Sequence, residues 1–310
     1  MSIFFYCPWH DKDNWIKSIK KIFKNEKILT TRDDPDYSKI QYAIVWDLPD
    51  SINKKLKNLK LFFSMGAGVD HILNLPSYKN TPIIRLKDLL MCERMANHVL
   101  SQILHYQLNL KKYSLAQNKN QWLDFNEPLS NSKITIGILG LGFLGSYVGN
   151  LLKNLGYNIE GFKASRPKKK YKFRVYYQNK HLKKFISNLD ILISILPDTK
   201  KTFNFIDNKF LKKMKKNSLL INVGRGSSIN EKHLINHLKK NKYFYASLDV
   251  FKKEPLPKNS PFWNLSNITI TPHVASLTAI DSAVNYMYKN YKKYKKNKKI
   301  KSDVNLRKGY

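Results

Sequence analysis

The chain has 310 residues, 42% of them hydrophobic, and its 56 Lys and Arg residues against 22 Asp and Glu residues give a formal net charge of +34. With a mean hydropathy of −0.47, this composition excludes a wholly disordered chain and a membrane protein with several spans. Two cysteines, Cys7 and Cys92, are too few for a disulfide framework or a four-cysteine zinc site. The length and the lack of a signal-peptide pattern predict a cytoplasmic protein of two domains.

The large positive charge by itself suggests a nucleic-acid-binding protein, because basic surfaces bind phosphates. Only seven of the basic residues are arginine, however, and arginine is the side chain whose fork of donors suits phosphates and bases. The lysines are spread along the chain among many Asn, Ile and Tyr residues. We therefore expect a solvated basic surface with no nucleic-acid partner, no membrane partner and no metal site. A polyanion contact at the densest basic run, residues 291–301, stays open as the alternative.

Taken in chain order, short apolar runs alternate with amphipathic segments, which is the pattern of βαβ units around a parallel sheet. After the first four runs, Met95, Val99 and Ile103 repeat at helical spacing and predict a long helix from Cys92 to about Asn118. Six further runs follow, and another helical segment begins at Ile280. The expected strands are Ser2–Tyr6, Tyr42–Trp46, Leu61–Met65, Ile83–Leu86, Ile134–Leu139, Asn158–Phe162, Ile191–Ile195, Leu219–Val223, Tyr245–Asp249 and Ile268–Thr271.

These elements predict an α/β fold with two Rossmann-like, doubly wound parallel-sheet domains and a cleft between them. The long helix would connect the domains, and the last helix would return the chain to the first domain. We expect a dinucleotide-binding domain at residues 99–274. Residues 1–98 plus 275–310 would form a substrate-binding, flavodoxin-like domain.

The strongest local signal is a strand that runs into Gly140-Leu141-Gly142-Phe143-Leu144-Gly145. In this pattern Gly140 permits a tight turn, Gly142 lets the backbone approach a pyrophosphate, and Gly145 lets the following helix pack against the strand. We expect that helix from Ser146 to about Leu155, and its N-terminus, with Phe143 and Leu144 just before it, would offer N–H groups to the phosphates. The motif predicts dinucleotide binding, and the alternative is a glycine turn with a purely structural role.

The end of the next strand indicates which dinucleotide binds. NAD sites usually place an acidic residue about 20 positions after the glycines, at the strand end, where it binds the ribose 2′-hydroxyl. Glu160 has roughly that spacing but precedes the strand end, which instead carries Ser165 and Arg166 between Lys163 and Lys168. A hydroxyl flanked by cations suits a 2′-phosphate, so we expect NADPH, with NADH as the alternative.

Three motifs, each just beyond an expected strand, carry residues suited to reducing a 2-oxo acid. They place Arg225 between two glycines, Glu254 before Pro255, and His273 after Thr271-Pro272. The carboxyl ends of parallel strands meet at one edge of a sheet, so these side chains should converge. An arginine can bind a carboxylate and polarise a carbonyl, a histidine can donate a proton, and a carboxylate can orient that histidine. Each residue alone has an ordinary structural explanation, but the ordered set behind a dinucleotide loop favours catalysis.

With these motifs, and with Gly66-Ala67-Gly68-Val69 and Ser260-Pro-Phe-Trp263, the chain resembles the D-isomer-specific 2-hydroxyacid dehydrogenase family, in particular its glyoxylate/hydroxypyruvate reductase A branch. The resemblance implies that Arg225 binds and polarises substrate and that Glu254 pairs with the acid/base His273. It also implies the following contacts: the substrate carboxylate on the backbone N–H groups of Gly66, Ala67, Gly68 and Val69, and the nicotinamide near Leu196, Pro197 and Asp249.

The activity that the resemblance implies is NADPH-dependent reduction of glyoxylate to glycolate and of hydroxypyruvate to D-glycerate, with His273 as general acid. The partners would be a small 2-oxo acid and a second copy of the chain in a homodimer. Trp46, Met91 and Trp122 would line the substrate pocket, Trp122 across the dimer, and a plain core role is the alternative for each. The alternative functions are reduction of another small 2-oxo acid and a non-catalytic dinucleotide sensor.

Overall fold

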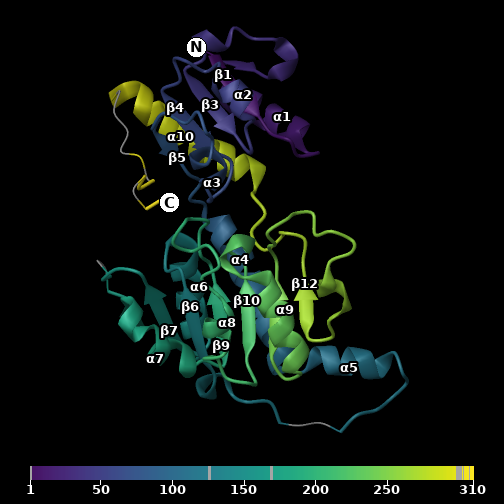
Figure 1. Ribbon diagram of the computed structural model, residues 1–310. Helices are drawn as coiled ribbons and strands as arrows, with labels where there is room; N and C mark the ends of the chain where they lie inside the picture. The colour runs from purple at the N-terminus through teal and green to yellow at the C-terminus, as the bar shows by residue number, and fades with distance from the viewer. Residues whose placement is uncertain (1, 125–126, 168–169, 298–301, 303, 307) are drawn as a thin grey trace. The chain divides into compact units, whose positions relative to one another are not determined.

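The computed structural model describes residues 2–124, 127–167, 170–297, 302, 304–306 and 308–310 (Figure 1). The chain divides into two compact units, one formed by Met1–Met91 with Thr278–Tyr310 and the other by Cys92–Leu277. The first division falls inside α4 (Leu89–Gln107), and the expected boundary at residues 98 and 99 lies further along the same helix. Among the described residues, no helix is long and apolar enough to cross a membrane.

The first unit is built on a five-stranded parallel sheet with the order β2-β1-β3-β4-β5. The four strands expected in this unit are present. Strand β2 was not expected, because its three residues, one of them exposed, show no readable alternation of apolar and polar side chains. The C-terminal helix packs on this unit, because Ser18 donates a 2.6 Å hydrogen bond to Asp281 and Phe23 packs edge-on against Tyr288. Its elements are β1 (Ser2–Tyr6), α1 (Lys12–Ile22), β2 (Lys27–Leu29), β3 (Tyr42–Val45), α2 (Asp50–Asn53), β4 (Leu61–Ser64), α3 (Asp70–Leu73), β5 (Ile83–Ile84) and α10 (Ile280–Asn297).

The second unit is built on a seven-stranded parallel sheet with the order β12-β11-β10-β9-β6-β7-β8. The strands near the middle, β9 and β10, are buried along their whole length, as expected for a sheet covered on both faces. Edge strand β8 was not expected, because Arg174–Tyr177 is a half-exposed segment in a basic stretch. The strands are β6 (Thr135–Leu139), β7 (Asn158–Lys163), β8 (Arg174–Tyr177), β9 (Ile191–Ser194), β10 (Leu219–Asn222), β11 (Tyr245–Leu248) and β12 (Ile268–Ile270).

The helices of this unit differ from the expectation at one point. The segment expected as a single helix from Cys92 to Asn118 is broken at Asn109, which has a left-handed backbone with φ 55°. Asparagine tolerates that conformation better than most residues, so it can separate two helices. The helices are α4 (Leu89–Gln107), α5 (Leu110–Gln117), α6 (Phe143–Asn154), α7 (Leu182–Ser187), α8 (Asn208–Leu211) and α9 (Glu231–Lys240).

Helix α6 packs unusually close to the sheet because two glycines face it. A Cβ on Gly145 would lie 2.1 Å from the Gly140 carbonyl oxygen, and one on Gly149 would lie 3.0 Å from Cδ1 of Ile138. Ile138 is fully buried in β6. The side chains of the strand therefore occupy the space that helix side chains would otherwise need, and the start of α6 is fixed against the end of β6.

Replacing Ile138 with Ala should lower the free energy of unfolding by about 2–5 kcal/mol, because a buried side chain is lost and leaves a cavity. Urea unfolding of the full chain, followed by far-UV circular dichroism, measures the change. Leu155→Ala is the matched control, since this side chain follows α6 and is 43% exposed. We expect the control to change stability by no more than about 0.5 kcal/mol. Equal effects of the two substitutions would show that the buried Ile138 side chain contributes no more to stability than an exposed leucine.

Candidate active site

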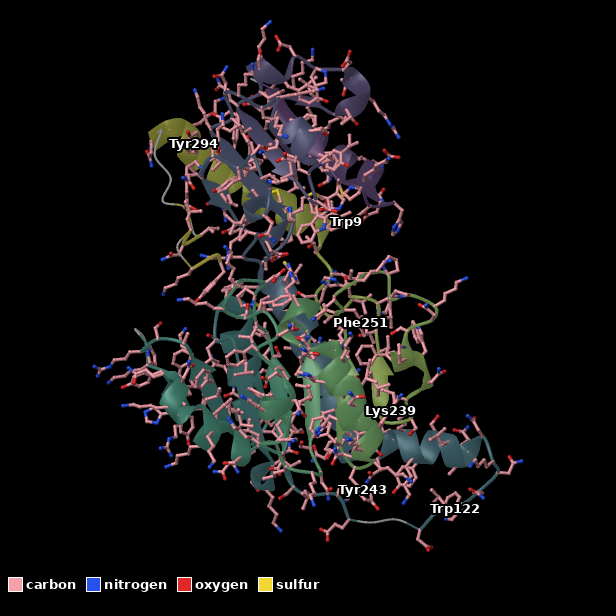
Figure 2. All side chains as sticks on the ribbon, in the orientation of Figure 1. Trp9, Trp122, Lys239, Tyr243, Phe251 and Tyr294 are labelled. Atoms are coloured by element: carbon pink, nitrogen blue, oxygen red, sulfur yellow. The ribbon has the colours of Figure 1, made fainter. Side chains whose placement is uncertain are left out.

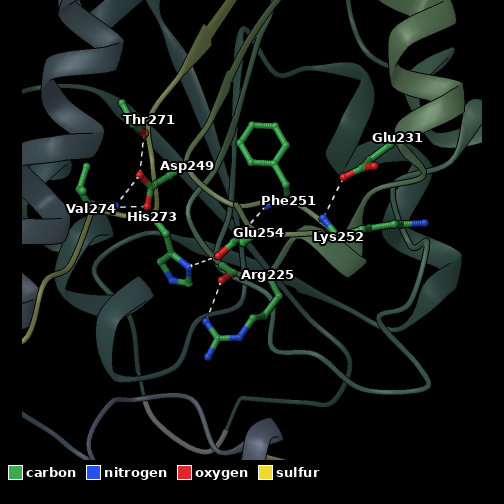
Figure 3. Close-up of polar contacts among 11 residues, drawn as sticks. Arg225, Glu231, Asp249, Phe251, Lys252, Glu254, Thr271, His273 and Val274 are labelled. Atoms are coloured by element: carbon green, nitrogen blue, oxygen red, sulfur yellow. Dashed lines mark hydrogen bonds and ion pairs between the residues drawn. The ribbon is translucent and has the colours of Figure 1, made fainter. Parts of the chain in front are cut away.

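The strand register of the second unit brings the three motif loops to one edge of the sheet. Asn222 at the end of β10 pairs with Leu248 at the end of β11, and Leu248 pairs with Ile270 at the end of β12. All these pairs are parallel, so the chain leaves the three strands at the same level. Arg225, Glu254 and His273 lie on the loops that follow these three ends (Figure 3).

Glu254 and His273 form a close pair. The Nδ1 atom of His273 lies 2.6 Å from Oε2 of Glu254, and the backbone N–H of Phe251 donates a 2.8 Å hydrogen bond to Oε1 (Figure 3). Burial alone would raise the pKa of Glu254, but these hydrogen bonds and the electrostatic attraction of His273 and Arg225 outweigh it and lower that pKa on balance. The carboxylate is therefore ionised near neutral pH. It holds a proton on Nδ1 and leaves Nε2 as the atom that can exchange a proton.

Asp249 fixes the backbone that carries His273. Its buried carboxylate accepts hydrogen bonds from the Thr271 hydroxyl at 2.6 Å and from the N–H groups of Val274 and Ala275 at 2.9 and 3.0 Å. The N–H of His273 donates to the Asp249 carbonyl at 2.8 Å. His273 has a left-handed backbone with φ 55°, a strained conformation that needs such surrounding contacts. The placement of the imidazole therefore depends on Asp249.

The loop of Arg225 is held by two residues to which the sequence analysis gave no role. The side chain of Asn222 closes the turn, since its Nδ2 donates to the Arg225 carbonyl at 3.1 Å and its Oδ1 accepts from Gly224 N–H at 3.3 Å. A Cβ on Gly226 would lie 2.0 Å from the carbonyl carbon of Phe251. Gly226 thus lets the Arg225 loop touch the Glu254 loop. The only sequence signal for either role was their place in the Asn-Val-Gly-Arg-Gly motif.

The glycine loop has the backbone geometry of a phosphate site. Gly140 has φ 95°, and a Cβ there would lie 2.4 Å from the Ile195 carbonyl, whereas a Cβ on Gly142 would meet nothing within 4 Å. Helix α6 begins at Phe143, earlier than the expected start at Ser146, so Phe143 and Leu144 lie in its first turn. The first N–H groups of a helix have no partner within it. The open side of Gly142 therefore faces outward beside free helix donors.

The end of β7 carries the residues expected to choose between NADH and NADPH. Ser165 and Arg166 follow the last residue of β7, Lys163, and both are exposed; Lys168 lies outside the described residues. Glu160 lies in mid-strand, where one of its oxygens accepts a 3.3 Å hydrogen bond from the Tyr176 hydroxyl. Burial raises the pKa of Glu160, which shows that its carboxyl group is partly withdrawn from water. Glu160, the acidic residue at the spacing of a ribose-binding carboxylate, is thus already hydrogen-bonded to Tyr176.

Leu196 and Pro197 follow β9 and pack beside the loop of Arg225. A Cβ on Gly224 would lie 2.6 Å from the backbone nitrogen of Leu196, so these two segments are in direct backbone contact. The carbonyl of Pro197 accepts a 2.6 Å hydrogen bond from the Thr202 hydroxyl, which fixes the loop after β9. The glycine loop, the end of β9 and the end of β10 therefore form one continuous rim.

The first unit carries the loop Gly66–Val69, directly after β4. The N–H of Gly66 donates to Ser64 Oγ at 3.4 Å. Within the described ranges, the N–H groups of Ala67, Gly68 and Val69 donate to no protein acceptor. Three neighbouring free donors on a glycine-containing loop have the chemistry that a small anion requires.

The three residues expected near the substrate lie in different environments. Met91 is buried, Trp46 is half-buried with its ring against Gly66, and Trp122 is 100% exposed on the segment that follows α5 (Figure 2). For Met91 this agrees with a core role. A fully exposed tryptophan has no role in the core of its own chain.

Two cavities on the described surface do not involve these residues. One, of about 330 Å³, lies beside α5 with Lys111 and Lys119 in its lining, and the other, of about 540 Å³, lies near Lys39 and Lys60. In the part of the chain that the structure describes, no group of three or more His, Cys, Asp and Glu residues is placed to hold a metal ion.

Comparisons with known proteins agree on one family. The model of the D-isomer specific 2-hydroxyacid dehydrogenase NAD-binding domain matches residues 100–275. Glyoxylate/hydroxypyruvate reductase A of Photorhabdus laumondii subsp. laumondii is 32% identical over 316 residues and covers 100% of both chains.

Solved structures give the same result. A D-isomer specific 2-hydroxyacid dehydrogenase from Xanthobacter autotrophicus Py2, in complex with NADPH and MES, is 28% identical, with a TM-score of 0.92 and coverage of 100% of this chain and 99% of that chain. An NADPH-dependent glyoxylate/hydroxypyruvate reductase from Sinorhizobium meliloti, in complex with NADP and sulfate, is 27% identical, with a TM-score of 0.93 and the same coverage. The chain therefore belongs to the D-isomer specific 2-hydroxyacid dehydrogenase family.

Proposed function

We propose that this protein uses NADPH to reduce small 2-oxo acids, glyoxylate to glycolate and hydroxypyruvate to D-glycerate. The observation that carries the proposal is the 2.6 Å pair of Glu254 and His273 on a rim shared with Arg225. The names of the Photorhabdus and Sinorhizobium relatives support the substrate class. The ligands of the Xanthobacter and Sinorhizobium structures support the cofactor.

The residues present fit a dinucleotide. The backbone at Gly142 is open where a Cβ would meet nothing within 4 Å, and the N-terminus of α6 offers donors to a pyrophosphate through Phe143, Leu144 and Gly145. Ser165 and Arg166 would bind the 2′-phosphate, since Glu160 is engaged with Tyr176. Leu196, Pro197 and Asp249 would lie beside the nicotinamide. When bound, NADPH supplies a hydride to the carbonyl carbon of the substrate.

The protein's own groups supply the proton and the electrostatic stabilisation. Arg225 would bind the substrate through its guanidinium donors and polarise the carbonyl oxygen as negative charge develops there. His273 would start protonated on both nitrogens and donate the Nε2 proton to that oxygen, which leaves a neutral ring with its proton on Nδ1. Glu254 stabilises the charged ring and fixes its orientation, because its Oε2 lies 2.6 Å from Nδ1.

The carboxylate of the 2-oxo acid would bind the backbone of Gly66–Val69. The free N–H groups of Ala67, Gly68 and Val69 are suited to this role, and the glycine at position 66 leaves room for the Trp46 ring against the loop. We also propose that the protein is a homodimer. The fully exposed ring of Trp122 and exposed leucines on and beside α5 support an apolar contact with a second copy.

The proposed activity predicts oxidation of NADPH, measured at 340 nm, with glyoxylate and with hydroxypyruvate. We expect kcat/KM with NADPH to exceed that with NADH by at least about tenfold, because a phosphate bound through charge-assisted hydrogen bonds adds about 1.5–3 kcal/mol. Turnover with NADH alone would contradict the cofactor assignment. Tight NADPH binding without turnover of either substrate would point to another 2-oxo acid or to a sensor.

His273→Gln should lower kcat/KM by about 10²–10⁴-fold, because the general acid is lost. The dissociation constant of NADPH, measured by fluorescence titration, should stay within about twofold, since the imidazole acts on the substrate. His181→Gln is the control, because His181 packs edge-on against Tyr177 in the same unit and is outside the site. An equal loss of NADPH affinity in His273→Gln would show that the histidine has a different role.

Arg166→Ala should raise KM for NADPH by about tenfold or more and leave KM for NADH nearly unchanged, because only NADPH carries the 2′-phosphate. Lys239→Ala removes one exposed positive charge from α9 (Figure 2). It is the control for the effect of a lower net positive charge on the binding of an anionic cofactor. A parallel rise for both cofactors, or an equal effect of Lys239→Ala, would contradict a specific contact.

A further inference from the structure

We propose that Ser64 and His71 are positioning residues that hold the loop Gly66–Val69 in the conformation that receives a carboxylate. The inference rests on the proposed function, because it concerns the carboxylate of the same 2-oxo acid. Every residue involved belongs to the unit formed by Met1–Met91 with Thr278–Tyr310.

The tautomer of His71 is set by the backbone of a neighbouring loop. The N–H of Asp47, which follows β3, donates a 3.1 Å hydrogen bond to Nδ1 of His71. Asp47 has a left-handed backbone with φ 48°, which an aspartate tolerates. Because Nδ1 accepts, the proton of the neutral ring is on Nε2, and that atom lies 3.1 Å from Ser64 Oγ. His71 therefore donates to Ser64.

Ser64 connects this histidine to the carboxylate loop. It is fully buried at the end of β4, and its Oγ donates a 2.8 Å hydrogen bond to the Gly68 carbonyl and accepts a 3.4 Å bond from Gly66 N–H. With the bond from His71, the proton and both lone pairs of the hydroxyl are in use. The N–H of Gly66 and the carbonyl of Gly68, on either side of Ala67, are thus both hydrogen-bonded to Ser64 Oγ. The loop curves around Ser64, and the N–H groups of Ala67, Gly68 and Val69 are left for a ligand.

The ring of His71 also supports the loop through Trp46. The two rings stack at 4.3 Å between centroids with a 36° tilt, and a Cβ on Gly66 would lie 2.6 Å from the Trp46 ring. The indole is therefore packed between His71 and the backbone of Gly66. His71 holds the loop by a hydrogen bond from one direction and by ring packing from another.

The test compares Ser64→Ala, His71→Leu and His71→Gln with the wild type. We expect Ser64→Ala and His71→Leu to raise KM for glyoxylate about tenfold, with kcat within about threefold, because the carboxylate donors lose their alignment. The inhibition constant of oxalate, which has carboxylates but no reducible carbonyl, should rise by the same factor. The dissociation constant of NADPH should not change. His71→Gln keeps an N–H donor toward Ser64 and should show a smaller rise in KM.

His10→Gln is the matched control, since His10 is an exposed histidine of the same unit. Unchanged KM and oxalate inhibition in both Ser64→Ala and His71→Leu, beside an active wild type, would overturn this inference and leave the proposed function standing. An equal fall in kcat and NADPH affinity would also overturn it, because it would show a general loss of structure. If His71→Gln were as impaired as His71→Leu, the hydrogen-bond role would be wrong. A wild type without turnover would overturn both proposals.

Discussion

The site of this protein depends on the common level at which β10, β11 and β12 end. Their register places Asn222, Leu248 and Ile270 side by side, so the three loops that follow emerge from one edge of the sheet. An arginine, a glutamate and a histidine that are up to 48 positions apart in the sequence thereby come to share one rim. A shift of one residue in the register would turn side chains to the opposite face and separate the three loops.

Close backbone approach is the second constraint, and glycine satisfies it. Gly224 lies against Leu196, Gly226 against Phe251, and Gly140 against Ile195, each at a distance where a Cβ would overlap the neighbouring backbone. These contacts join the ends of β6, β9, β10 and β11 into a continuous rim. These three glycines therefore allow loops to approach that side chains would keep apart, whereas Gly142 has open space beside it.

The few acidic residues of this basic chain have specific tasks. Asp249 uses both carboxylate oxygens to fix the loop of His273, and Glu254 orients the imidazole. Asp190 accepts a 2.8 Å hydrogen bond from Thr135 N–H at the start of β6 and binds Lys215 at 2.7 Å. Each of these carboxylates holds a loop or a strand end in place through the hydrogen bonds that it accepts. Most lysines of the described residues, by contrast, are exposed to solvent.

The order of the elements, the βαβ pattern and the residue types of the site could be predicted from the amino-acid sequence, because apolar periodicity and glycine motifs report local geometry directly. Short or half-exposed elements such as β2 and β8 escaped it, since three or four residues give too little periodicity. The folded structure was needed to show that Asp249 holds the His273 loop and that Glu160 is hydrogen-bonded to Tyr176. It also decided that His71 and Ser64 hold Gly66–Val69. These roles depend on hydrogen bonds between segments that meet only after the strands are in register, and no local pattern in the sequence encodes that meeting.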